Sequence, residues 1–179
     1  MVPTPSRSAV DELVTMFDHV LEESGFGWDH WHSLLWNLHN VRDDEWDRAP
    51  VEGHRTIRQL VLHIGDGFLS YASHAFGDRS YQWASHVVHD VSPGETSAEV
   101  IAWIRLAHRE LHEHIATLTD DELSVLRSAP WGEQYETRRL IELQIQHAIY
   151  HTGEINHLRA LLQGNDEPGN DDIGREASN

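Results

Sequence analysis

The sequence lacks cysteine, holds few basic residues and contains no long apolar run. Without cysteine, the chain forms no disulfide, offers no thiolate to a metal and has no cysteine nucleophile. The longest uninterrupted apolar run, residues 100–104, is five residues long, whereas a membrane helix needs roughly 20. Residues 1–10 lack the apolar core of a signal peptide. We therefore expect a cytoplasmic protein that does not enter a membrane.

The charge balance argues against nucleic acids and anionic membranes as partners. Only 13 Lys and Arg stand against 30 Asp and Glu, which gives a net charge of −17 with histidine neutral. Nucleic acids and anionic membrane surfaces both require a basic patch on the protein. The 179 residues, 39% of them hydrophobic, have the length and composition of one globular domain. We expect small molecules as partners, and no nucleic acid.

Helical periodicity is what the sequence does contain. Apolar residues recur at intervals of three and four from Ser8 onward and over residues 28–43, 56–76, 96–118 and 137–162. The first two stretches are either separate helices or one bent helix. Ser8 with Asp11 resembles an N-terminal cap, Thr96 with Glu99 forms a capping box, and Gly77 and Gly164 are typical stop signals. Residues 128–136 are interpreted as a connection, and no strand of convincing length is present.

These patterns predict an all-α protein, a four-helix bundle over residues 1–164. Residues 165–179 are polar and acidic without periodicity, so we expect a disordered tail. Residues 78–94 lack a clear period, and Tyr81 and Trp83 within them either pack on the bundle or form a lid over a pocket.

Fifteen histidines are a high content for this length, and one pair lies inside an apolar stripe. In the segment LIELQIQHAIYHTGEINHLRALL, His147 and His151 are one helical turn apart on the core-facing side. Imidazoles at this spacing can converge on one ion, with metal–nitrogen bonds of about 2.0–2.1 Å. They can equally be core histidines paired with neighbouring polar groups. His108 and His112 repeat the spacing, although only His108 lies on its stripe.

A mononuclear site needs a third ligand from another helix. His63 is the best candidate; it lies at the margin of its stripe, and Gly67 one turn later leaves room beside it. His32 and His39 are weaker candidates for the lining of the same cavity, and His157 is expected at the surface. Asp66 and Glu154 are candidates to orient the ligand histidines.

Two segments resemble motifs of the DinB-like superfamily. RTIRQLVLHIGDG resembles its second-helix motif and QHAIYHTGEINHLRALL its last-helix motif, and a weaker resemblance covers roughly residues 28–163. The resemblance implies a four-helix bundle in which three histidines bind a divalent metal. Matched motif to motif, those ligands are His63, His147 and His151.

The resemblance also implies candidate activities. Characterised relatives include mycothiol- and bacillithiol-dependent transferases and a thiol-dependent isomerase. Nitrogen ligands suit a transition metal such as Zn, Ni or Fe, and a low-molecular-weight thiol would supply the sulfur that this chain lacks. The alternative is a non-catalytic, stress-associated metal-binding module. A homodimer formed through the tryptophan-rich stripe of Trp28, Trp31, Leu35 and Leu38 is compatible with either function.

Overall fold

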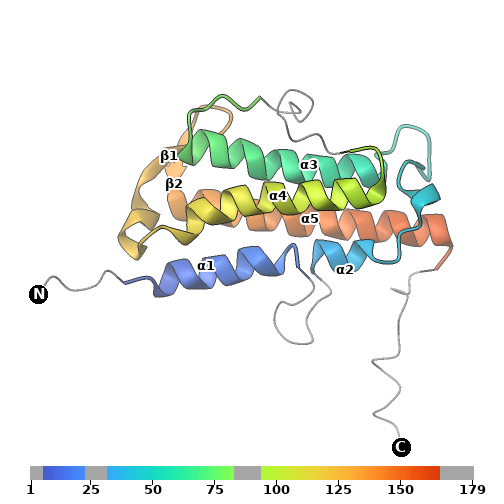
Figure 1. The fold of residues 1–179 in the computed structure, drawn as a ribbon, viewed down its shortest axis with the longest axis horizontal. Helices are drawn as coiled ribbons and strands as arrows, with labels where there is room; N and C mark the ends of the chain where they lie inside the picture. Colours follow the sequence, from blue (N-terminus) through green and yellow to red (C-terminus); the bar gives the residue numbers. More distant parts are fainter. Residues whose placement is uncertain (1–5, 23–31, 83–93, 166–179) are drawn as a thin grey trace, which may run out of the picture.

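The fold is seen in a computed structural model that describes residues 6–22, 32–82 and 94–165 (Figure 1). Several predictions from the sequence concern residues outside these ranges. They are the disordered tail, the lid role of Trp83, and the part of the tryptophan stripe that holds Trp28 and Trp31.

The described chain is all-α apart from one small hairpin. The α-helices are α1 (Ser8–His19), α2 (Leu34–Leu38), α3 (Ile57–Tyr71), α4 (Ser97–Ala116) and α5 (Thr137–Gln163). Shorter elements are the 3₁₀ turns η1 (Asp43–Glu45) and η4 (Asp120–Ser124), the π-helical turn η2 (Ala72–Phe76), and strands β1 (Leu126–Ser128) and β2 (Gln134–Glu136). The predicted four-helix bundle is therefore confirmed, with α1 and α2 together occupying one of its four positions (Figure 1).

Helices α1 and α2 are joined end to end by backbone hydrogen bonds. The N–H groups of Leu34 and Leu35 donate to the carbonyls of Val20 and Leu21, each over 3.0 Å. Ser33 caps α2 through its side chain and also donates to the Leu21 carbonyl. Of the second predicted stretch, residues 34–38 form a helix in line with α1, and residues 39–42 lie outside any helix.

The core lies between all the helices of the bundle, and the stripes of α3, α4 and α5 that the sequence predicts contribute most of it. Trp103 of α4 packs on Gly65 of α3 so closely that a Cβ there would stand 2.2 Å from the indole ring. The capping box of Thr96 and Glu99 forms as predicted, and Thr56 with Gln59 forms a second one at the start of α3. The tight α3–α4 contact holds α3 in place, so the face of α3 that meets α5 is well defined.

The N-terminus of α1 is capped differently from the prediction. Ser8 is the first helical residue and forms no cap, since the carboxylate of Asp120 accepts the backbone N–H groups of Ala9 and Val10, each over 3.0 Å. An acceptor 110 residues away in sequence satisfies the orphan donors of the first turn, and local sequence cannot reveal it.

The connection before α5 contains a β-hairpin that the sequence analysis missed. Strand β1 pairs antiparallel with β2, with Arg127 opposite Tyr135. Gly132 has a φ of +92° in the turn, a conformation that favours glycine. Three-residue strands are too short to show an alternation of apolar and polar residues. The side chain of Arg127 ties the hairpin to Thr137 of α5 and to the Ala75 carbonyl of η2, which places the turn beside the end of α3.

None of the described helices is long and apolar enough to span a bilayer.

Candidate metal centre

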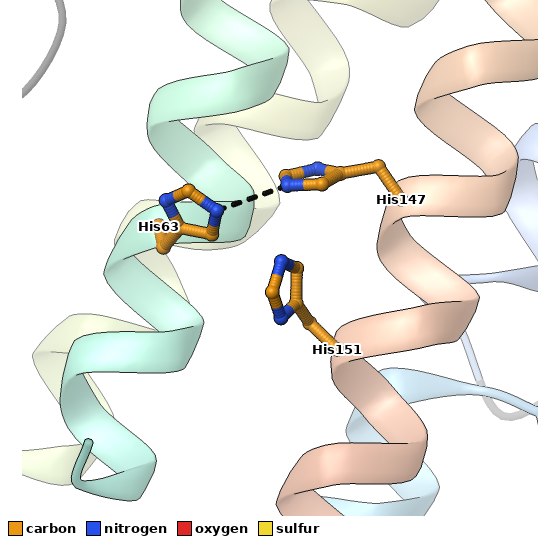
Figure 2. A group of neighbouring side chains, drawn as sticks. All are labelled: His63, His147 and His151. Atoms are coloured by element: carbon orange, nitrogen blue, oxygen red, sulfur yellow. Dashed lines mark hydrogen bonds between the residues drawn. The ribbon is translucent and has the colours of Figure 1, made fainter. Parts of the chain in front are cut away.

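Three histidines from two helices meet at the interface of α3 and α5. His63 lies on α3, and His147 and His151 lie one turn apart on α5. One ring nitrogen from each lies within 4.8 Å of the others, and the Nε2 atoms of His63 and His147 are 3.1 Å apart. Figure 2 shows the three rings turned toward one centre. The structure thus brings together the three residues that the sequence analysis selected.

Helix α5 holds its two histidines on a long, regular scaffold. It runs uninterrupted for 27 residues and ends at Gly164, whose φ of 71° is the left-handed stop that the sequence predicts. The rings of His147 and His151 are 4.6 Å apart between centroids and nearly perpendicular, at 87°. The His63 ring lies 4.9 and 4.7 Å from them.

A glycine on α3 makes room for His147, as predicted. A Cβ added to Gly67 would lie 3.3 Å from the Cε1 and Nδ1 atoms of His147 and 3.0 Å from Oε1 of Gln144. Any larger residue would push against both side chains, so glycine permits the close approach of α3 and α5 at this level.

Burial keeps two of these imidazoles neutral. It is the main cause that lowers the pKa of His147 to about 4, and the nearby His151, His63 and Arg55 act in the same direction. Burial also lowers the pKa of His63, with His151 and Arg55 adding to the effect and Asp66 and Glu154 opposing it. Metal ligation requires the neutral form of histidine, so His63 and His147 are in the ligating form at neutral pH.

Of the two acidic candidates to orient the histidines, Glu154 contacts the cluster and Asp66 hydrogen-bonds with Tyr81. Nδ1 of His151 lies 2.9 Å from Oε2 of Glu154, so the carboxylate accepts a proton held on Nδ1 and leaves Nε2 as the basic atom. Asp66 is buried and accepts a hydrogen bond from the Tyr81 hydroxyl. Tyr81 itself is 5% exposed, so of the two roles open to it, packing is the one observed.

An apolar hollow of about 460 Å³ opens beside His147. It is lined by Tyr71, Pro130, Trp131, Leu143, Gln144 and His147. Of these, His147 lies on the core-facing side predicted for its helix, but no pattern in the sequence marks Trp131 or Leu143. Their proximity depends on the hairpin, which folds Trp131 back toward Tyr71, with ring centroids 6.1 Å apart.

The remaining candidate histidines lie elsewhere. His32 and His39 are exposed and His108 is in the α1–α4 interface, and none of them belongs to the three-histidine group in the described part of the chain. His32 and His39, which the sequence left as weaker candidates, are not among the residues that line the hollow beside His147. They lie around the short helix α2, where Nδ1 of His39 contacts the carbonyl of Trp36. His157 is exposed, as predicted.

The donor set fits a divalent transition metal. Two nitrogens bound to one tetrahedral zinc ion stand about 3.4 Å apart, given bonds of about 2.0–2.1 Å, and the 3.1 Å between His63 and His147 is close to that separation. Three nitrogen donors also leave at least one coordination position for water or a ligand, as in catalytic rather than structural sites.

Comparison with known proteins places the three histidines within a family match. A family model described as the DinB superfamily matches residues 29–155, more than half of the chain and a span that contains all three histidines. A search of curated proteins finds no significant match.

Proposed function

The chain belongs to the DinB superfamily, and from this premise we propose that it is a thiol-dependent metalloenzyme. It binds one divalent transition metal through His63, His147 and His151 and acts as an S-transferase or isomerase with a low-molecular-weight thiol of the mycothiol or bacillithiol type. The observation that carries the proposal is the convergence of three imidazole nitrogens beside an apolar hollow.

Each residue at the site has a defined role in this proposal. His63 and His147 present neutral Nε2 atoms, because burial lowers the pKa of both side chains. Glu154 accepts the proton on Nδ1 of His151, which aims Nε2 of that ring at the centre. Gly67 allows His147 to approach α3. The three ligands are therefore all imidazoles, and none of them is a carboxylate that would offset the charge of the metal.

The metal would supply Lewis acidity: a divalent ion with an open position lowers the pKa of a bound thiol or water. The chain has no cysteine, so the sulfur must come from a free thiol. Nitrogen ligands suit Zn, Ni and Fe.

The alternative function is a non-catalytic metal-binding module of a stress response. That alternative requires only the three ligands and gives the hollow beside His147 no role. The enzyme requires the three ligands and also the hollow, because a substrate must lie next to the metal. The hollow is thus the observation that favours the enzyme.

A thermal-shift screen tests the proposal. Zinc-loaded protein is melted with and without mycothiol, bacillithiol and cysteine, and the metal-free protein and the His147→Ala variant serve as controls. We expect at least one thiol to raise the melting temperature of the zinc-loaded wild type alone. Zinc binding with no response to any thiol favours the non-catalytic module, and absence of zinc binding contradicts both.

Cytoplasmic location and a homodimer stay predictions. Cell fractionation and light scattering of the purified protein would check them.

A further inference from the structure

We propose that the hollow beside His147 binds an uncharged aromatic group of the substrate. The inference builds on the proposed function, since it names the kind of molecule on which the thiol would act. It follows from the position of the hollow, the nature of its walls and the way one wall is held.

The hollow continues the same helix interface that holds the histidines. On α3, His63, Gly67 and Tyr71 follow at intervals of four residues and so share one face. Opposite them on α5, which runs antiparallel, lie His147 and then Gln144, and both line the hollow together with Tyr71. His147 belongs both to the cluster and to the lining of the hollow. A group in the hollow therefore touches a metal-ligand candidate directly.

The walls select for an uncharged group. Among the described residues, the lining of the hollow contains no Asp, Glu, Lys or Arg. Gln144 is 3% exposed, and its Oε1 has no hydrogen-bond partner among the residues that the structure describes. A charged ligand would lose its hydration here without compensation. The volume of about 460 Å³ lies in the range of small-molecule sites.

The two aromatic walls favour a ring over an aliphatic group. Tyr71 and Trp131 meet edge to face, at 70° between ring planes, and an aromatic ligand can add a further edge-to-face or offset contact with each. Leu143 and Pro130 complete the lining with aliphatic surface.

Trp131 is exposed, and neighbouring side chains of the hairpin hold its indole in place. Its side chain is 55% exposed. Its indole Nε1–H donates to Oε2 of Glu133 over 3.2 Å, and the same carboxylate oxygen accepts the Tyr135 hydroxyl. Tyr135 also packs edge to face on Trp131, with centroids 5.9 Å apart. The indole is thus prearranged at the mouth of the hollow, which reduces the entropy lost on binding.

Binding of benzyl alcohol, followed by ligand-observed NMR on the metal-free protein, tests the inference without reliance on the metal. We expect wild type to bind benzyl alcohol more tightly than cyclohexylmethanol, and Trp131→Ala to weaken benzyl alcohol by at least about fivefold, as loss of an aromatic contact implies. Trp131→Phe should retain most of the affinity. Leu126→Ala is the matched control, because Leu126 lies in the same hairpin, is similarly exposed at 58%, and does not line the hollow.

Equal affinity in wild type, Trp131→Ala and Leu126→Ala, or no binding by wild type, overturns the inference. Because metal is absent from this measurement, a failure of the proposed function does not affect its outcome. Wild type that binds zinc but not benzyl alcohol leaves the proposed function intact and refutes the aromatic site alone.

A second measurement tests whether the hollow opens onto the histidine cluster. Benzyl alcohol is added to protein loaded with paramagnetic Co²⁺ and, as a control, with diamagnetic Zn²⁺. We expect faster relaxation of its ring protons with Co²⁺ in the wild type and loss of that difference in Trp131→Ala. Equal relaxation with the two ions in the wild type would contradict a site beside the cluster.

Discussion

Two histidine pairs with the same spacing have opposite environments in this protein. His147 and His151 on α5 lie nearly perpendicular to each other and meet His63 from α3. His108 and His112 on α4 lie closer to parallel, at 26° with centroids 6.0 Å apart, and no third histidine joins them in the described residues. Spacing alone therefore does not distinguish a candidate metal centre from structural histidines.

The two pairs differ in the groups that their ring nitrogens contact. Nε2 of His108 donates to the Phe17 carbonyl over 3.0 Å, and its ring stacks on that of Phe17 at 4.3 Å. His112 and His108 both face Asp18, at 3.5 and 3.7 Å. These contacts join α1 to α4. The α5 pair instead turns nitrogen atoms toward another histidine.

The hollows beside the two pairs differ in the same way. The one next to His108 and His112, about 600 Å³, is lined by charged side chains that include Asp18, Glu22 and Arg105. The one next to His147 is apolar. A lowered pKa does not separate the pairs, because burial lowers the pKa of His108 as well as that of His147. Partners, rather than spacing or burial, identify the site.

The largest difference that we expect between the two histidine pairs is in metal affinity. We expect His147→Ala to lower zinc affinity by more than about 100-fold, because a direct ligand should cost at least as much as the outer groups that orient ligands. His112→Ala should change it by less than about twofold. Competition titration with a chromophoric chelator measures both, and similar losses in the two variants would erase the distinction.

A smaller effect on affinity should follow from Glu154→Gln. The carboxylate holds Nδ1 of His151 at 2.9 Å, and loss of such a group costs roughly 10–100-fold. We expect about tenfold, the lower end, because the Glu154 side chain is 39% exposed. Glu142→Gln is the matched control: the residue lies on the same helix with 38% exposure and pairs with Arg139 instead. Equal affinities of the two variants would remove Glu154 from the site.

In the metal-free protein, we expect substitution in the α4 pair to lower the stability more than substitution in the α5 pair. His108→Ala loses the hydrogen bond to Phe17 and the stacked ring, so we expect unfolding to become easier by about 2 kcal/mol. His147→Ala should cost less than about 1 kcal/mol, since the ring loses one hydrogen bond, to Nε2 of His63, while its buried Nδ1 has no partner among the described residues. Urea denaturation in the presence of a chelator measures both values. A larger loss for His147→Ala would mean that the α5 pair is the structural one.

The last expected effect is on the pH dependence of that stability. Between pH 6.5 and about 4 the unfolded chain binds a proton that folded His147 does not. Stability contributed by this residue is therefore complete above pH 6.5 and declines as the pH falls toward 4, with a slope below the one-proton limit of about 1.4 kcal/mol per pH unit. We expect the decline in urea-denaturation free energy to be shallower in His147→Ala. An unchanged slope would contradict the lowered pKa.

Much of the fold follows from local sequence. The stripes and stop signals of α4 and α5 predict those helices to within a few residues, as with Thr96 at one start and Gly164 at one end. Asp120 at the N-terminus of α1 and the β1–β2 hairpin were missed. A cap from 110 residues away and two three-residue strands leave no periodic pattern.

The candidate site, too, was predicted only in part from local sequence. Helical spacing put His147 and His151 on one face, but it left His63 at a stripe margin, and only the resemblance to a family joined the three. Trp131 was not predictable as a wall of the hollow, because its position depends on how the hairpin packs against the end of α3.

The central claim is that His63, His147 and His151 hold one metal ion while the pair on α4 holds none. Anomalous diffraction at the zinc absorption edge, from crystals of the zinc-loaded protein, tests it most directly. The account predicts one strong anomalous peak per chain, about 2.0–2.1 Å from one ring nitrogen of each of the three histidines. A strong peak between Asp18, His108 and His112, or no peak at the α3–α5 cluster, would contradict it.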